Sequence, residues 1–133
     1  MRIYLAGGYS RREELNRYAR ELEQMTHLVV ARWLHGQHEM LPGMPEEVRG
    51  RFAEEDLEDL LQADCVIVFT DEQAPSRGGH HVETGLAIAM HRYGRRLLVV
   101  GPRTNVFHWL PRVVEHYESW PEARLALRAE VGV

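Results

Sequence analysis

The chain has 133 residues, of which 44% are hydrophobic and 27% charged, and a formal net charge of −4. This length and composition fit one soluble globular domain with a buried core. The arginines are spread along the sequence rather than clustered, which excludes the basic patch of a protein that binds nucleic-acid polymers. A single cysteine excludes an internal disulfide, and no apolar run is long enough to span a membrane, so we expect a cytoplasmic protein.

Strand and helix patterns alternate along the first half of the chain. Residues 2–6 predict a short strand that ends at two glycines, Gly7 and Gly8. Apolar residues at helical spacing predict a helix in the segment that follows, and β-branched and aromatic residues predict a second strand over 28–34. Two glycines and two prolines within 35–45 predict a loop.

The second half continues this alternation. Pro45 suits the start of a long helix that runs to about residue 63. The apolar run from Cys65 to Thr70 predicts a strand buried on both faces, with Cys65 in the core. The remaining expected elements are a helix over about 80–94, a strand over 96–101, a short strand over 113–117 and a final helix from Pro121.

Strands that alternate with helices predict a parallel sheet with helices on both faces. We therefore expect a single α/β domain over residues 1–133, with a doubly wound parallel sheet of the flavodoxin-like or Rossmann-like kind. The expected sheet has five strands in the order 2-1-3-4-5. Ligands of such open sheets bind in a crevice at the carboxyl ends of the strands, where the segment 71–79 begins.

Asp56 interrupts the apolar side of the long predicted helix. An unpaired carboxylate among apolar side chains is costly. Asp56 therefore caps a loop, pairs with an arginine, or points into the ligand crevice. The other acids of this helix, Asp59 among them, fall on faces that we expect to be solvated. The apolar side itself consists of Val48, Phe52, Ala53, Leu57, Leu60 and Leu61.

Glu83 shows the same anomaly in the next predicted helix. If that helix starts near His80, Glu83 falls in its first turn, where free backbone N–H groups and the helix dipole favour an ionised carboxylate. Glu83 also lies within an arc of apolar residues that includes Leu86 and Ala87. It is either a helix-start acid favoured by the dipole, or a nucleophile or base at the mouth of the crevice.

Two acids near strand ends indicate cleavage of a glycosidic bond. In such enzymes one carboxylate attacks or stabilises the sugar and the other handles the proton. A nucleotide-binding sensor or a structural assembly protein has no need of acids on apolar helix faces. Histidine clusters at 35–38 and 80–81 lack the spacing of a metal site, so we expect no metal. The turn Gly7-Gly8-Tyr9-Ser10 lacks the lysine of a P-loop and the third glycine of a dinucleotide fingerprint, so we expect no nucleotide cofactor either.

Four segments, in order, resemble the nucleoside 2-deoxyribosyltransferase superfamily, which includes the 2′-deoxynucleoside 5′-monophosphate N-glycosidases. The most specific segment runs from Pro75-Ser76 through His81-Val82-Glu83-Thr84-Gly85-Leu86-Ala87 and resembles the family's nucleophile loop and helix. The other three are Ile3-Tyr4-Leu5-Ala6-Gly7-Gly8, similar to the first strand and glycine turn; Glu55-Asp56-Leu57 through Ala63-Asp64-Cys65-Val66, similar to the Asp-bearing helix and its strand; and Asn105-Val106-Phe107-His108-Trp109, similar to a segment lent to a neighbouring subunit's site.

The resemblance implies a role for each matching residue. Glu83 would attack the anomeric carbon of deoxyribose, Asp56 would bind a sugar hydroxyl or orient the nucleophile, and Tyr4 would position Glu83 or the sugar. Departure of the base would leave a glycosyl-enzyme, which water or a second base resolves. The implied substrate contacts are Gly8, Ser10 and Arg11 at the base or the 5′ end, Ser76, Arg77, Gly78, Gly79 and His80 around the 5′ group, and Asn105 and Phe107 from a neighbouring subunit.

The chain departs from the transferases six residues before the nucleophile. They carry an acid there, whereas this chain has Arg77, preceded by Ser76. Such a loop looks more like that of the monophosphate hydrolases, where hydroxyl and backbone N–H groups hold a phosphate. We therefore expect hydrolysis of a 2′-deoxynucleoside 5′-monophosphate or a 2′-deoxynucleoside. Base exchange by transfer and a sensor without turnover are the alternatives, and a lent segment would require a homodimer or a higher homo-oligomer.

Overall fold

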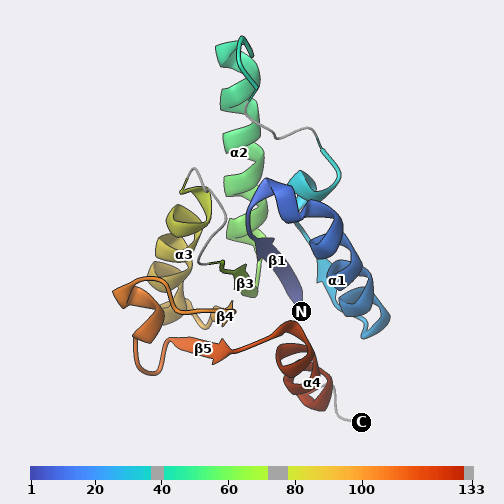
Figure 1. The fold of residues 1–133 in the computed structure, drawn as a ribbon, viewed down its shortest axis with the longest axis vertical. Coiled ribbons are helices and arrows are strands. Elements are labelled where there is room, and N and C mark those ends of the chain that lie inside the picture. The colour runs from blue at the N-terminus through green and yellow to red at the C-terminus, as the bar shows by residue number, and fades with distance from the viewer. Residues whose placement is uncertain (37–40, 72–77, 131–133) are drawn as a thin grey trace.

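The computed structural model describes residues 1–36, 41–71 and 78–130. Among these residues, five parallel strands form one sheet in the order β2-β1-β3-β4-β5, so the predicted fold and strand order are confirmed (Figure 1). The strands are β1 (Arg2–Ala6), β2 (Leu28–Val29), β3 (Cys65–Phe69), β4 (Arg96–Val100) and β5 (Val114–Tyr117). The helices are α1 (Arg12–Gln24), α2 (Glu46–Gln62), α3 (Gly79–Met90) and α4 (Trp120–Glu130), with short 3-10 turns η1 (Tyr9–Arg11), η2 (Arg32–Leu34), η3 (His91–Tyr93) and η4 (Val106–Trp109).

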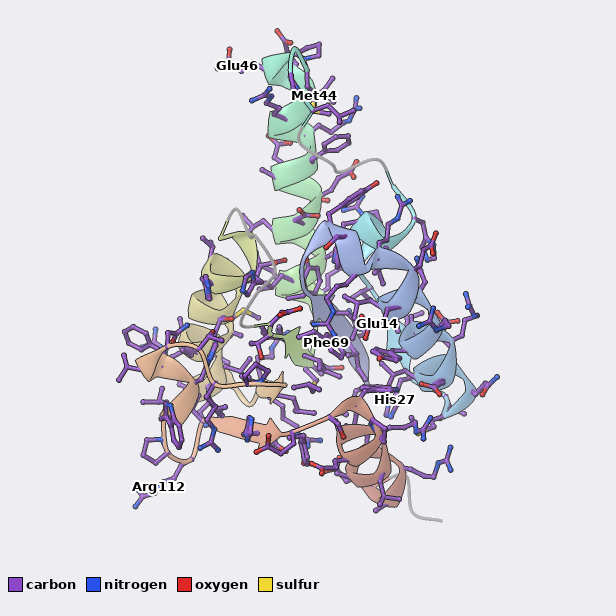
Figure 2. All side chains as sticks on the ribbon, viewed as in Figure 1. Glu14, His27, Met44, Glu46, Phe69 and Arg112 are labelled. Carbon is purple, nitrogen blue, oxygen red and sulfur yellow. The ribbon has the colours of Figure 1, made fainter. Side chains whose placement is uncertain are left out.

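Helices cover both faces of the sheet, with α2 and α3 on one side and α1 and α4 on the other (Figure 1). Tyr4 of β1 points to the first side, because its hydroxyl contacts Glu83 of α3. Phe69 of β3 points to the second side, where its ring packs 5.5 Å from Tyr18 and 5.8 Å from Trp120 (Figure 2). β3 is buried along its whole length, as its apolar run predicts.

The second strand is shorter than predicted, because β2 has two residues and a 3-10 turn follows it. Two side chains take the backbone groups that the next step of the ladder would use. The N–H of Arg32 donates to the carboxylate of Asp59 at 2.8 Å, and the C=O of Leu5 accepts from the indole Nε1 of Trp33 at 2.8 Å. Side-chain competition therefore ends the pairing of β2 with β1.

Helix α2 differs from the prediction on two of its faces. Asp59, expected to be solvated, has only 5% of its surface exposed, because it pairs with Arg32. Leu57 and Leu61, expected on the apolar side, are 44% and 49% exposed.

The described residues include no helix that is both long and apolar enough to cross a membrane.

Gly101, directly after β4, is required by a close approach to the end of β3. Its φ is 113°, and an added Cβ would lie 2.8 Å from Thr70 Oγ1 and 2.9 Å from the backbone oxygen of Thr70. Gly101→Ala should therefore lower the free energy of unfolding by about 2–3 kcal/mol, measured by urea denaturation.

The matched control is Gly50→Ala in α2. Gly50 is exposed, and nothing lies within 4 Å of the position that a Cβ would take. This substitution should raise the free energy of unfolding by about 1 kcal/mol, because alanine favours a helix. If Gly101→Ala were as stable as the parent protein, the two strand ends would not be in obligatory contact.

Candidate active site

Tyr4 and Glu83 form a hydrogen bond between the first strand and the third helix. Tyr4 lies in the middle of β1 and is fully buried, and its hydroxyl donates to Oε2 of the half-buried Glu83. Alternate side chains of a strand point to opposite faces, so Ile3 and Leu5 face α1 while Tyr4 faces α3. The alternating side chains of β1 therefore place the Tyr4 hydroxyl on the side of the sheet that carries Glu83.

Glu83 lies in the second turn of α3 rather than the first. The helix begins at Gly79, and its first turn contains no acid. The prediction that the helix start keeps Glu83 ionised is therefore wrong. Burial instead raises the pKa of Glu83 to about 7, the hydrogen bond from Tyr4 works in the opposite direction, and the charge of Asp56 adds to the rise.

Asp56, on α2, belongs to the same electrostatic environment. Burial raises the pKa of Asp56 to about 7, repulsion by Asp59 and Glu55 adds to the rise, and Arg32 opposes it. The charge of Asp56 in turn raises the pKa of Tyr4 and of Glu83. The structure thus brings together the three residues predicted to carry the chemistry, from β1, α2 and α3.

Two carboxyl groups with pKa values near neutrality are suited to acid and nucleophilic chemistry. Repulsion disfavours the state in which Asp56 and Glu83 are both ionised, so the pair tends to keep one proton near neutral pH. Burial and the two carboxylates raise the pKa of Tyr4, which therefore remains a hydrogen-bond donor. A donated hydrogen bond stabilises a carboxylate, and this contact favours the ionised form of Glu83.

The glycine turn after β1 leads to a paired arginine. Gly8 precedes η1 with an extended backbone, and Ser10 is exposed. Arg11 binds Glu14 through Nε at 2.8 Å and Nη2 at 3.1 Å, and its Nη1 donates to the backbone oxygen of Thr70 at 3.2 Å. A cavity of about 250 Å³ opens beside this ion pair on the α1 side of the sheet. Substrate binding by Arg11 stays a prediction.

The start of α3 combines a glycine turn with two histidines. Gly78 has a φ of 85°, a conformation that favours glycine, and its backbone leads directly into the helix. The rings of His80 and His81 lie 4.0 Å apart, and burial, with the neighbouring histidines, lowers the pKa of His80. Within the described ranges, no three His, Cys, Asp or Glu side chains gather as a metal ion requires. Two further predicted contacts, Ser76 and Arg77, lie outside the described residues.

Asn105 has a local role at the start of η4. Its Oδ1 accepts from the backbone N–H of Phe107 at 2.9 Å, and its Nδ2 lies 3.3 Å from Nδ1 of His81. Both ends of the amide therefore contact groups of the same chain. Phe107 is 60% exposed. A contribution of Asn105 and Phe107 to a neighbouring subunit's site stays a prediction.

The sequence analysis missed the ion pair between Arg32 and Asp59. Arg32 lay in a segment predicted to be a strand, and Asp59 on a face predicted to be solvated. One available indication was the spacing of Asp59 from Asp56, because residues three apart are neighbours on a helix. The partner, 27 residues away along the chain, could not be found from helical spacing.

Comparison with known proteins agrees with this architecture. The family model of nucleoside 2-deoxyribosyltransferase matches residues 3–106. The solved 2-deoxyribosyltransferase of Bacillus psychrosaccharolyticus is 19% identical, with a TM-score of 0.70 over 93% of this chain and 90% of that one. The CMP N-glycosidase of Clostridium botulinum is 20% identical, with a TM-score of 0.63 over 97% and 99% of the two chains. A conserved protein of Enterococcus faecalis is 14% identical, with a TM-score of 0.56 over 98% and 96%.

The fold and the family match define an α/β enzyme with a doubly wound parallel sheet. The chain belongs to the nucleoside 2-deoxyribosyltransferase family, because the family model spans most of its length. No curated protein matches it in sequence. The superfamily resemblance found in the four sequence segments is thereby confirmed.

Tyr4→Phe should raise the pKa of Glu83. The substitution removes the hydrogen bond that opposes the effect of burial, while the repulsion by Asp56 remains. The measurement is a ¹³C NMR titration of the Glu83 carboxyl group. Tyr18→Phe is the matched control, because the Tyr18 hydroxyl donates to Glu14 at 2.7 Å on the other side of the sheet. A pKa of Glu83 that stays the same or falls in Tyr4→Phe would contradict the assigned role of Tyr4.

Proposed function

We propose that this enzyme hydrolyses the N-glycosidic bond of a 2′-deoxynucleoside 5′-monophosphate or a 2′-deoxynucleoside, with Glu83 as the nucleophile. The observation that carries the proposal is the buried Tyr4–Glu83 hydrogen bond beside Asp56. A carboxylate oriented by one donor keeps its other oxygen for attack on a sugar carbon. Family membership supports the reaction class.

The proposed reaction has two steps. In the first, a carboxylate oxygen of Glu83 bonds to C1′ of the sugar while the bond between C1′ and the base nitrogen breaks, and the bonding electrons leave with the base. Asp56, which holds the shared proton, protonates the departing base. In the second step, water attacks C1′, Asp56 takes the proton of the water, and the sugar leaves Glu83.

The 5′ group of the substrate is proposed to lie at the start of α3. Backbone N–H groups at Gly78 and Gly79 begin this helix, and such groups bind anions. One structural relative is named for its action on CMP, a nucleoside monophosphate, which supports a phosphate group on the substrate. Another is named a 2-deoxyribosyltransferase, which supports a 2′-deoxy sugar and keeps base exchange as the alternative.

Glu83→Gln should abolish base release, with a loss of turnover of at least about 10³-fold, because an amide cannot form the glycosyl-enzyme. Chromatography would follow free base from deoxynucleosides, their 5′-monophosphates and CMP, with and without an acceptor base. Glu54→Gln, at an exposed position of α2, is the control. Free base without an acceptor supports hydrolysis, and an exchanged nucleoside supports transfer. Full turnover in folded Glu83→Gln, or no turnover by the parent protein on any compound, would refute the proposal.

We also propose that a second copy of the chain covers the side of the sheet that carries the acids, giving a homodimer or a higher homo-oligomer with a shared active site. Exposed apolar side chains gather on α2, α3 and η4, and such groups of apolar side chains mark interaction surfaces. The second copy is the occupant that the resemblance implies, since the family lends the segment beginning at Asn105 to a neighbour. The exposed residues on α2, α3 and η4 are Leu57, Leu61, Val82, Val106, Phe107 and Trp109.

Leu61→Glu should dissociate the assembly, because a charge in an apolar interface is costly to bury. Analytical ultracentrifugation would show a shift towards the monomer, accompanied by a loss of turnover of about tenfold or more. Leu125→Glu is the matched control, because Leu125 is 67% exposed on α4, away from the acids. Dissociation by Leu125→Glu but not by Leu61→Glu would place the interface on the other side of the sheet.

A further inference from the structure

We propose that the Arg32–Asp59 ion pair sets the charge at the active site: Asp59 binds the guanidinium of Arg32 and keeps the shared proton on Asp56. Asp59 is then a positioning residue that acts through Asp56 and touches no substrate. This inference rests on the proposed function, because it gives that proton to the departing base.

Asp59 is nearly fully buried and is bound by the guanidinium and the backbone N–H of Arg32. Only 5% of its surface is exposed, and three hydrogen bonds from Arg32 reach its carboxylate. The backbone N–H of Arg32 donates to Oδ2 at 2.8 Å, and Nε donates to Oδ1 at 3.0 Å and Oδ2 at 3.2 Å. Bonds from a cation and a backbone donor stabilise the negative form of a carboxylate. A fixed negative charge therefore lies one helical turn from Asp56.

The guanidinium of Arg32 extends from Asp59 towards solvent. Its Nη2 donates to Glu58 Oε2 at 2.8 Å and to the backbone oxygen of Glu55 at 3.3 Å. The Arg32 side chain is 50% exposed and that of Glu58 63%, whereas that of Asp59 is 7% exposed. The outer end of the cation is thus bound by the carboxylate of Glu58, and water screens the cation more than it screens Asp59.

The backbone around Arg32 cannot move easily towards Asp56. The indole of Trp33 is bonded to the backbone oxygen of Leu5 at 2.8 Å, and the amide of Asn16 donates to the backbone oxygen of Leu34 at 2.9 Å. These contacts tie η2 to β1 and α1. The side chain of Asp59 ties the same turn to α2, so the backbone that carries Arg32 is held from three elements.

The charged and titratable neighbours of Asp56 come from four elements. The charge of Asp56 acts on Glu83 of α3 and on Tyr4 of β1. Glu55 and Asp59 share α2 with Asp56, and Arg32 lies on η2. Asp59 and Glu55 raise the pKa of Asp56, and Arg32 lowers it. The two members of one ion pair therefore have opposite effects on the same carboxyl group.

Because the two effects are opposite, the direction in which the pKa of Asp56 shifts tests the proposal. Asp59→Asn removes the negative charge, so the pKa of Asp56 should fall and the alkaline limb of the kcat/KM profile should move to lower pH. A move of about one pH unit is a tenfold loss of turnover on that limb. Arg32→Gln removes the positive charge, so the pKa of Asp56 should rise and the alkaline limb of the profile should move to higher pH. Arg32→Lys, which keeps the charge, should restore the parent profile.

The control is Glu58→Gln, which removes an exposed charge from the same arginine and should leave the pKa of Asp56 unchanged. The pKa would be read by ¹³C NMR titration, which does not require turnover, so this test is separate from that of Glu83→Gln. If Asp59→Asn does not fold, the opposite shift in Arg32→Gln still decides the question. Shifts of the same sign in both variants, or unchanged titration with lower stability, would show that the ion pair serves the fold alone.

Discussion

The hydrogen bond between Tyr4 and Glu83 is the contact on which the site depends. A carboxylate removed from water is costly unless a donor stabilises it. Here the donor, Tyr4, is itself fully buried. It lies on β1, an inner strand of the sheet that pairs with β2 on one side and β3 on the other. β1 and α3 are far apart in sequence, and the pairing of β1 with β3, the strand that precedes α3, brings the two side chains together. The topology of the sheet therefore creates the contact.

Acidic residues crowd one helix, and the fold treats them unequally. The exposed Glu58 binds Nη2 of the Arg32 guanidinium, and the buried Asp59 binds its Nε. Asp56, one turn away, experiences the repulsion of its neighbours together with the effect of burial. Helix α2 thus binds the cation of Arg32 on its outer side. Its inner carboxyl group, Asp56, therefore keeps a proton at a pH where exposed acids have lost theirs.

The parts of the fold and site that the sequence predicted depend on local patterns. Strand β3 was predicted from a continuous apolar run, and Asp56 was identified because one polar residue interrupted a helical apolar row. The parts it missed depend on partners distant in the chain. The length of β2 is limited by Asp59, 27 residues from Arg32, and the raised pKa of Glu83 follows from burial under elements that no local pattern identifies.

The exposed leucines of α2 show what a hydrophobic pattern does and does not specify. Leu57 and Leu61 occupy the predicted apolar side together with Leu60, yet Leu60 is buried in this chain and the other two are not. A periodic pattern predicts that a face is covered, but it does not say whether the covering atoms belong to the same chain. The discrepancy is therefore itself informative. It lies on the helix that carries Asp56, so a second copy packed there would also remove water from the acids and strengthen every charge interaction among them.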